Sequence, residues 1–332
     1  MATAWTVAQA ALNEKDPLKM GIMMTFWMES NAMAAIPWIT IPRLSVSMTY
    51  QRRLSLTKPG WAVIGGTYTS ANPELTTKEE QPFLLGRDID TAKHLVGLEG
   101  QFEDPRSLAV EEAMKEFAYE FNEAFINGPA INADGTNNPN ALTGVRERVA
   151  ANAALTGLAD LQVSVSANGT AFGPTASSAN RHAVLDSLNR AIYTVDTKRP
   201  DWGFCNDTLL LAIESAFRRE GLFANTRDQY ERIVSTFREI PLYDIGLKAN
   251  QADKIITDTE NQGTSAVSTS IYFGKNGVRT HFHGWEKSTL DVRDLGEINS
   301  GPTLRTRVDW EPALADWHPR CLARVRGILA TT

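Results

Sequence analysis

Residues 104–128 read DPRSLAVEEAMKEFAYEFNEAFING, and this stretch decides the fold. Its apolar side chains recur at three- and four-residue spacing, which is typical of an amphipathic helix: Leu108, Val110, Ala113, Met114, Phe117, Phe121, Ala124 and Phe125. Asp104 suits the N-cap, and Asn127-Gly128 supplies a stop signal. The pattern predicts one helix over 105–127, roughly 33 Å long.

The residues before this helix predict a β-hairpin over 43–83 that projects from the body. Apolar and polar side chains alternate from Leu44 to Tyr50, as in a strand. A turn signal at Lys58-Pro59-Gly60 and a polar tip follow, so we expect the returning strand over 83–89. A lone hairpin is marginally stable in water. The hairpin therefore needs a neighbouring subunit to lie on.

The remaining segments have weaker signals. Residues 1–42 are broken by prolines and predict an N-terminal arm. Beyond the helix the composition is mixed α/β, with predicted helices over 180–195 and 207–219 and predicted strands over 202–205, 237–243 and 268–273. Strand-like alternation returns over 304–310 and 321–328. We expect these two strands to pair with each other and to pack against the long helix.

Composition excludes several classes of protein. The chain has 332 residues, with 42% hydrophobic and 22% charged residues, as in soluble globular proteins. The net charge of -6, without basic runs, predicts at most weak contact with nucleic acid. The apolar stretch 20–28 is too short for a bilayer, so no membrane association is expected. Cys205 and Cys321 predict buried free thiols.

The search for chemistry finds few candidates. His281 and His283 form either a ligand pair or an exposed strand face. Asp88 and Asp90 either hold a cation or are solvated. No phosphate-binding or nucleophile motif appears. We therefore predict no catalytic, cofactor-binding or metal-binding residues, and no enzymatic activity.

Five stretches carry a family resemblance: 56–61 (LTKPGW), 84–90 (LLGRDID), 125–128 (FING) followed by 138–144 (NPNALTG), 236–243 (TFREIPLY) and 307–310 (RVDW). In this order they resemble the major capsid proteins of tailed bacteriophages, which have the Hong Kong 97-like capsid fold. The resemblance implies an α+β fold with four parts: an N-terminal arm (1–42), an extended β-hairpin loop (43–83), a peripheral domain (84–145 and 286–332) with a spine helix (105–127), and an α/β axial domain (146–285).

For function, the resemblance implies self-assembly. Pentamers and hexamers would form an icosahedral shell around double-stranded DNA in the virion, after assembly in the host bacterial cytoplasm. Its implied partners are a portal protein at one vertex and a decoration protein outside, with weak, non-specific contact to the packaged DNA. Only about 40 residues precede the hairpin, so either a separate scaffolding protein guides assembly or the chain assembles unaided.

Two other functions stay open. An encapsulin-like nanocompartment shell shares this fold and encloses enzymes instead of a genome. An oligomeric α+β enzyme is the alternative from another class. Some capsid proteins of this family join neighbours through a Lys–Asn isopeptide bond. We identify no matching Asn or Glu, and expect non-covalent contacts.

The expected inter-subunit contacts lie in the arm and the hairpin: Arg52, Arg53, Lys58, Trp61, Glu79, Glu80 and Trp27. The basic side chains would reach acidic groups on neighbouring subunits. Tryptophan is enriched at interfaces, although burial in the core explains these tryptophans equally well.

Overall fold

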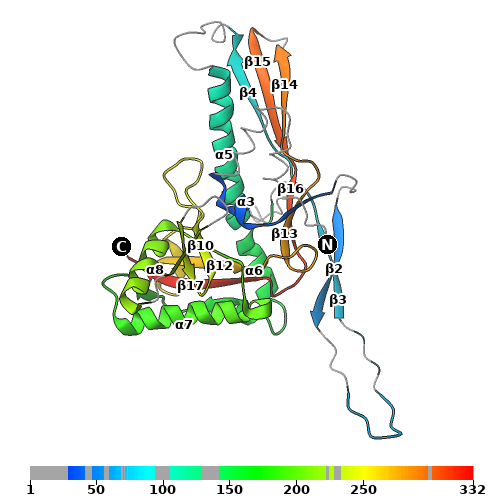
Figure 1. The fold of residues 1–332 in the computed structure, drawn as a ribbon, viewed down its shortest axis with the longest axis vertical. Coiled ribbons are helices and arrows are strands. Elements are labelled where there is room, and N and C mark those ends of the chain that lie inside the picture. Colours follow the sequence, from blue (N-terminus) through cyan, green and yellow to red (C-terminus); the bar gives the residue numbers. More distant parts are fainter. Residues whose placement is uncertain are drawn as a thin grey trace.

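The computed structural model describes residues 29–41, 47–55, 60–68, 70, 72, 74–93, 105–128, 142–221, 224–227, 233–297 and 301–331. Figure 1 shows a long arm built on one helix, a sheet-and-helix body, and a hairpin that projects away from both. Helices and sheets are mixed, as the α+β prediction requires. No described helix is both long and apolar enough to cross a membrane.

The long arm is built on the predicted spine, helix α5 (Pro105–Asn127). Its apolar face is buried, since Phe117 and Phe121 are only 4% and 1% exposed. The ring of Phe121 lies 5.0 Å from that of Trp310 and 5.7 Å from that of Trp38. Trp38, from the predicted N-terminal arm, thus packs in the core beside α5 of its own chain.

The end of α5 is also confirmed. The Gly128 N–H donates to the carbonyl oxygen of Ala124 at 2.9 Å, and a side chain at Gly128 would collide with the carbonyl oxygen of Leu142. Only glycine therefore fits where α5 meets the segment that enters helix α6 (Val145–Ala153). Asp104, the predicted N-cap, lies outside the described residues.

An antiparallel sheet lies along α5, in the order β14 (Asp291–Glu297), β15 (Thr303–Trp310) and β4 (Leu85–Ala92). In the β4–β15 register, Asp88 faces Arg307 and Asp90 faces Arg305. Both carboxylates accept two hydrogen bonds of 2.6–2.9 Å from the facing guanidinium. These bonds lower the pKa of both aspartates, so the two carboxylates form a ladder of surface ion pairs.

The hairpin forms, but with a different returning strand. Strand β2 (Met48–Ser55) pairs with β3 (Glu74–Glu80). The segment predicted as its partner, 83–89, lies mainly in β4 instead. Strand β3 reads ELTTKEE, which has no apolar alternation and resembles a polar tip. It forms a strand because Lys78 and Glu80 point to buried partners, a feature that local sequence does not reveal.

The body contains a large sheet with the strand order β5 (Gln162–Ser164), β17 (Leu322–Ala330), β12 (Ser265–Gly274), β7 (Trp202–Cys205), β10 (Ile240–Asp244), β9 (Ile233–Phe237) and β8 (Ala224–Arg227). Strands β6 (Thr170–Phe172) and β11 (Glu260–Gln262) join at β17 and β12. The predicted helices α7 (Ser178–Thr194) and α8 (Asp207–Glu220) pack against it. Helix α8 ends at Gly221, whose φ of 68° is left-handed.

The predicted pairing of the last two strands is wrong. Strand β15 pairs with β4 and β14, whereas β17 pairs antiparallel with β12 and parallel with β5 and β6. Alternation in the sequence shows which face of a strand is buried but not which strand lies beside it. Residues 322–330 therefore belong to the large sheet, although the resemblance placed them with the peripheral segment.

A small sheet connects the arm to the body, in the order β1 (Trp38–Thr40), β13 (Phe282–Glu286) and β16 (Pro312–Asp316). The remaining described elements are α3 (Asn31–Ala35), η1 (Ala159–Leu161) and η2 (Asp196–Lys198). Strand β16 ends at a fully buried aspartate beside the root of the hairpin.

Candidate assembly interface

The loop of the hairpin exposes large apolar side chains. Trp61 and Ile64 are fully exposed, at 101% and 107%, while Val63 and Tyr68 are 82% and 79% exposed. The segment that carries them contains a turn, in which the Gly66 N–H donates to the carbonyl oxygen of Val63 at 2.8 Å. Burying each such side chain stabilises a protein by roughly 1.5–3 kcal/mol. We call Trp61, Val63, Ile64 and Tyr68 the apolar tip.

The tip lies far out on the hairpin, which leaves the body beside α6 (Figure 1). The polar stretch predicted for the tip, 67–80, begins after Trp61, Val63 and Ile64 and includes the exposed Tyr68. The described part of this chain does not cover the apolar tip. Exposed apolar patches of this kind mark interaction sites on soluble proteins.

The root of the hairpin is fixed by a cluster of ion pairs, which we call the buried ion cluster. Its members are Arg52, Lys78, Glu80, Arg148 and Asp316. Arg148, from α6, is its centre. Its guanidinium donates to both carboxylate oxygens of Glu80, at 2.7 and 2.8 Å, and to Oδ1 of Asp316 at 3.0 Å. The bidentate bond to Glu80 ties strand β3 of the hairpin to the body.

Asp316, at the end of β16, contacts the remaining cations of the cluster. Its carboxylate accepts from the ammonium of Lys78 at 2.6 Å and from the hydroxyl of Tyr50 at 3.0 Å, and lies 3.4 Å from Nη1 of Arg52. Burial raises the pKa of Asp316, but the surrounding cations outweigh it and hold that pKa well below its usual range. Since both hairpin strands contribute partners, the root is held from two sides.

The cluster changes the roles predicted for two hairpin residues. Arg52 and Glu80 were expected to reach neighbouring subunits, yet they are only 6% and 9% exposed and pair within the chain. Side chains buried at the root cannot extend outward. Trp61 and Glu79 are exposed, as an inter-subunit role requires.

For three other predicted contact residues the structure gives no side-chain exposure. Arg53 lies in β2 opposite Leu75. Lys58 and Trp27 fall outside the described residues, as do parts of the predicted arm. Their roles between subunits stay predictions.

Sequence reasoning missed Lys78, Arg148 and Asp316. A partial signal exists in the hairpin, because Tyr50 and Arg52, like Lys78 and Glu80, are two residues apart and so share a strand face. No local signal brings Asp316 to them, because 238 residues or more separate it from each of its partners in the hairpin.

The histidines and cysteines considered as candidates in the sequence lie as follows in the structure. His281 Nε2 lies 2.8 Å from Oδ2 of Asp196, and His283 is buried in β13, so the prediction of an exposed strand face is wrong for His283. Cys205 and Cys321 are buried free thiols, as predicted. Within the described ranges, no group of three His, Cys, Asp or Glu side chains is placed to hold a metal ion.

Comparisons with known proteins define the fold. No protein-family model and no curated protein matches the chain. Among solved structures, the capsid of a native GTA particle matches with a TM-score of 0.60 and 16% identity over 90% of each chain. The SrpI encapsulin of Synechococcus elongatus PCC 7942 matches with a TM-score of 0.56 and 14% identity, over 99% of this chain and 96% of that chain. A chain from Mycobacterium phage Bobi matches with a TM-score of 0.57 and 10% identity over 89% of each. The chain thus has the Hong Kong 97-like capsid fold.

Proposed function

We propose that this chain is the major capsid protein of a tailed bacteriophage. It assembles as pentamers and hexamers into an icosahedral shell around double-stranded DNA, and its role is structural, not enzymatic. The observation that carries the proposal is the apolar tip, held at the end of a hairpin whose root is locked by the buried ion cluster. Such a hairpin presents an apolar patch at a fixed distance from the body, which suits a repeated contact with the next copy of the chain.

The proposed contacts between subunits start from the exposed side chains of Trp61 and Glu79. The apolar tip, including Trp61, docks on a neighbouring copy, with Glu79, Arg53, Lys58 and Trp27 as further contacts. The net charge of -6 keeps the contact with packaged DNA weak. A separate scaffolding protein, a portal protein at one vertex and an outer decoration protein complete the proposed assembly in the bacterial cytoplasm and the virion.

An encapsulin-like nanocompartment is the second candidate. It is favoured by the match to the SrpI encapsulin, which extends over 99% of this chain. The two candidates differ in what the particle contains. Particles purified from the source and treated with nuclease contain protected double-stranded DNA under the first proposal, and enzyme cargo without DNA under the second.

Electron microscopy of the full chain, produced both alone and together with the proposed scaffolding protein, tests the shared part of both candidates. We expect closed shells from the wild type and soluble, folded subunits or capsomers from the double variant Trp61→Ser/Ile64→Ser. Leu211→Ser is the matched control, because Leu211 is 54% exposed on α8, outside the hairpin. Closed shells from the double variant, or only small oligomers from the wild type, would contradict the proposal.

A further inference from the structure

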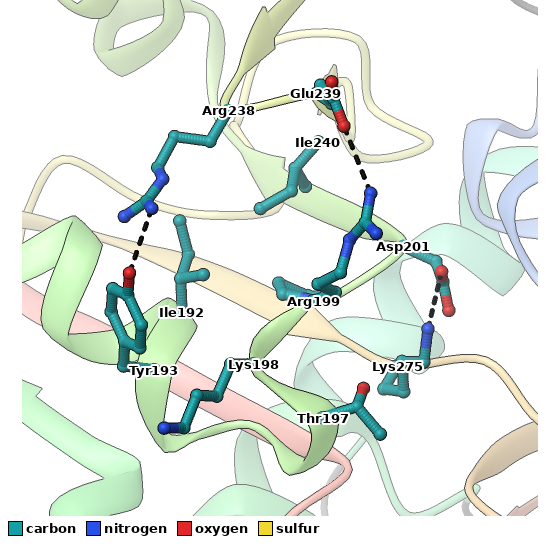
Figure 2. A pocket seen from close by; sticks show the side chains of 11 residues that line it. Ile192, Tyr193, Thr197, Lys198, Arg199, Asp201, Arg238, Glu239, Ile240 and Lys275 are labelled. Atoms are coloured by element: carbon teal, nitrogen blue, oxygen red, sulfur yellow. Dashed lines mark hydrogen bonds and ion pairs between the residues drawn. The ribbon is translucent and has the colours of Figure 1, made fainter.

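A basic hollow of about 850 Å³ opens beside the C-terminal end of α7. Its walls are the segment 197–201 that follows α7 and the turn 238–239 between β9 and β10. Figure 2 shows the side chains of Lys198 and Arg238 on either side of Tyr193, with Ile192 and Ile240 between these two walls. Neither the assembly contacts nor the buried ion cluster uses these residues.

The lining carries excess positive charge. Four cations, Lys198, Arg199, Arg238 and Lys275, face two carboxylates, Asp201 and Glu239, which leaves a net charge of +2. Arg199 pairs with Glu239 at 3.1 Å and Lys275 with Asp201 at 3.0 Å. The two carboxylates are therefore already engaged.

The other two cations have only neutral partners in the described part of the chain. The guanidinium of Arg238 donates to Oδ1 of Asn189 at 3.0 Å and to the hydroxyl of Tyr193 at 3.1 Å. The ammonium of Lys198 lies 5.7 Å from the centre of the Tyr193 ring. Their charges, exposed on opposite sides of one ring, remain available to an anion.

Both cations belong to residues whose backbone lies in the left-handed region. Thr197 and Lys198 have φ of 61° and 56°, and Arg238 and Glu239 have φ of 52° and 69°. The left-handed region is unfavourable for residues other than glycine, by about 1–3 kcal/mol each. Four of the six described non-glycine residues with positive φ thus line one hollow. Such strain is typical of ligand sites.

We propose that this hollow binds a small molecule that carries several phosphate groups. Its volume lies in the range of small-molecule sites, roughly 300–1,000 Å³. Guanidinium and ammonium groups are the side chains that recognise phosphate oxygens. The apolar side chains of Ile192 and Ile240 would contact the part of the ligand without charge. A DNA duplex is too wide to enter a hollow bounded by two tight turns.

Calorimetric titration of the full chain with inorganic tripolyphosphate at low ionic strength tests the proposal. We expect saturable binding that weakens as salt is added. In the double variant Lys198→Gln/Arg238→Gln the Kd should rise roughly tenfold or more. The control is Arg279→Gln, because Arg279 is also exposed and has a φ of 57° but does not line the hollow. The control should bind like the wild type.

Thermal unfolding provides a second measurement. Tripolyphosphate should raise the Tm of the wild type and of the control, but not that of the double variant. Because both substituted side chains are exposed, the double variant should melt like the wild type without ligand. Three results would overturn the proposal: no binding by the wild type, equal binding by the double variant, or complete displacement of tripolyphosphate by an equal phosphate concentration of short DNA duplex.

Discussion

Asp316 is fully buried, yet it carries a charge that connects three parts of the molecule. Asp316 belongs to β16, and its carboxylate forms ion pairs with Lys78 of the hairpin and Arg148 of α6. A buried ion pair contributes little net stability compared with apolar packing, but loss of one partner leaves an uncompensated charge. The buried ion cluster therefore acts mainly by fixing where the hairpin leaves the body.

Asp316→Asn should lower the free energy of unfolding by roughly 3–5 kcal/mol, because Glu80 would then be the one carboxylate left in the cluster to pair with its three cations, of which Arg52 and Arg148 are buried. Urea denaturation at neutral pH measures this. Glu239→Gln is the control, since the pair of Glu239 with Arg199 is exposed, and its loss should cost about 0–1 kcal/mol. If Asp316→Asn were as stable as the wild type, the buried cations of the cluster would not depend on Asp316.

His283 should make the fold sensitive to mild acid. Burial and the charge of Arg279 lower its pKa from 6.5 to about 4. The unfolded chain therefore binds a proton near pH 6.5 while the folded chain stays neutral. Stability is complete above pH 6.5 and falls as the pH drops toward 4, by about 3 kcal/mol in total.

Urea denaturation between pH 7 and 4 checks this dependence. His283→Gln should remove that part of the slope, whatever its effect on stability at pH 7. The control is His182→Gln, because the side chain of His182 is 57% exposed. The idea fails if His283→Gln and the wild type lose stability in parallel across this range.

At the scale of elements, the three longest described helices were predictable, whereas α6 and the strand partners were not. Helices α5, α7 and α8 carry a local period of apolar residues and recognisable stop signals, such as Gly128 and Gly221. Strand β3 has no such pattern, and its conformation depends on Arg148 and Asp316, which are distant in the sequence. For the same reason the sequence identified the hairpin but neither its returning strand nor its buried root.

The apolar face of α5 should contribute most to the stability of the long arm. Phe121→Ala should cost roughly 3–5 kcal/mol, because Phe121 is 1% exposed and its truncation leaves a cavity between Trp38 and Trp310. Leu108→Ala, on the same helix and 45% exposed, should cost less than about 1.5 kcal/mol. Chemical denaturation of both variants measures the difference. Similar losses for the two would mean that α5 is not packed as described.

At the scale of the whole molecule, the hairpin reverses the usual arrangement of side chains. Its root joins a cluster of five charged groups, four of which are buried, and its end exposes Trp61, Val63, Ile64 and Tyr68. A soluble monomer gains nothing from such a distribution, because the exposed apolar surface costs free energy in water. In a subunit that repeats one contact around a shell, the same apolar side chains could be buried against the next copy of the chain.

If the apolar tip holds neighbouring subunits together, assembled shells should resist salt. At about 1 M salt the Debye length falls to about 3 Å, so exposed ion pairs between subunits are screened, whereas apolar contacts persist. We expect intact shells by electron microscopy and light scattering after this treatment. Boiling in detergent should then release a single band near 36.6 kDa, because the contacts are non-covalent. Glu79→Gln, which removes an exposed charge of the hairpin, should leave both results unchanged. Dissociation in salt would assign the assembly to surface charge, and a ladder of multimers on the denaturing gel would assign it to covalent bonds between subunits.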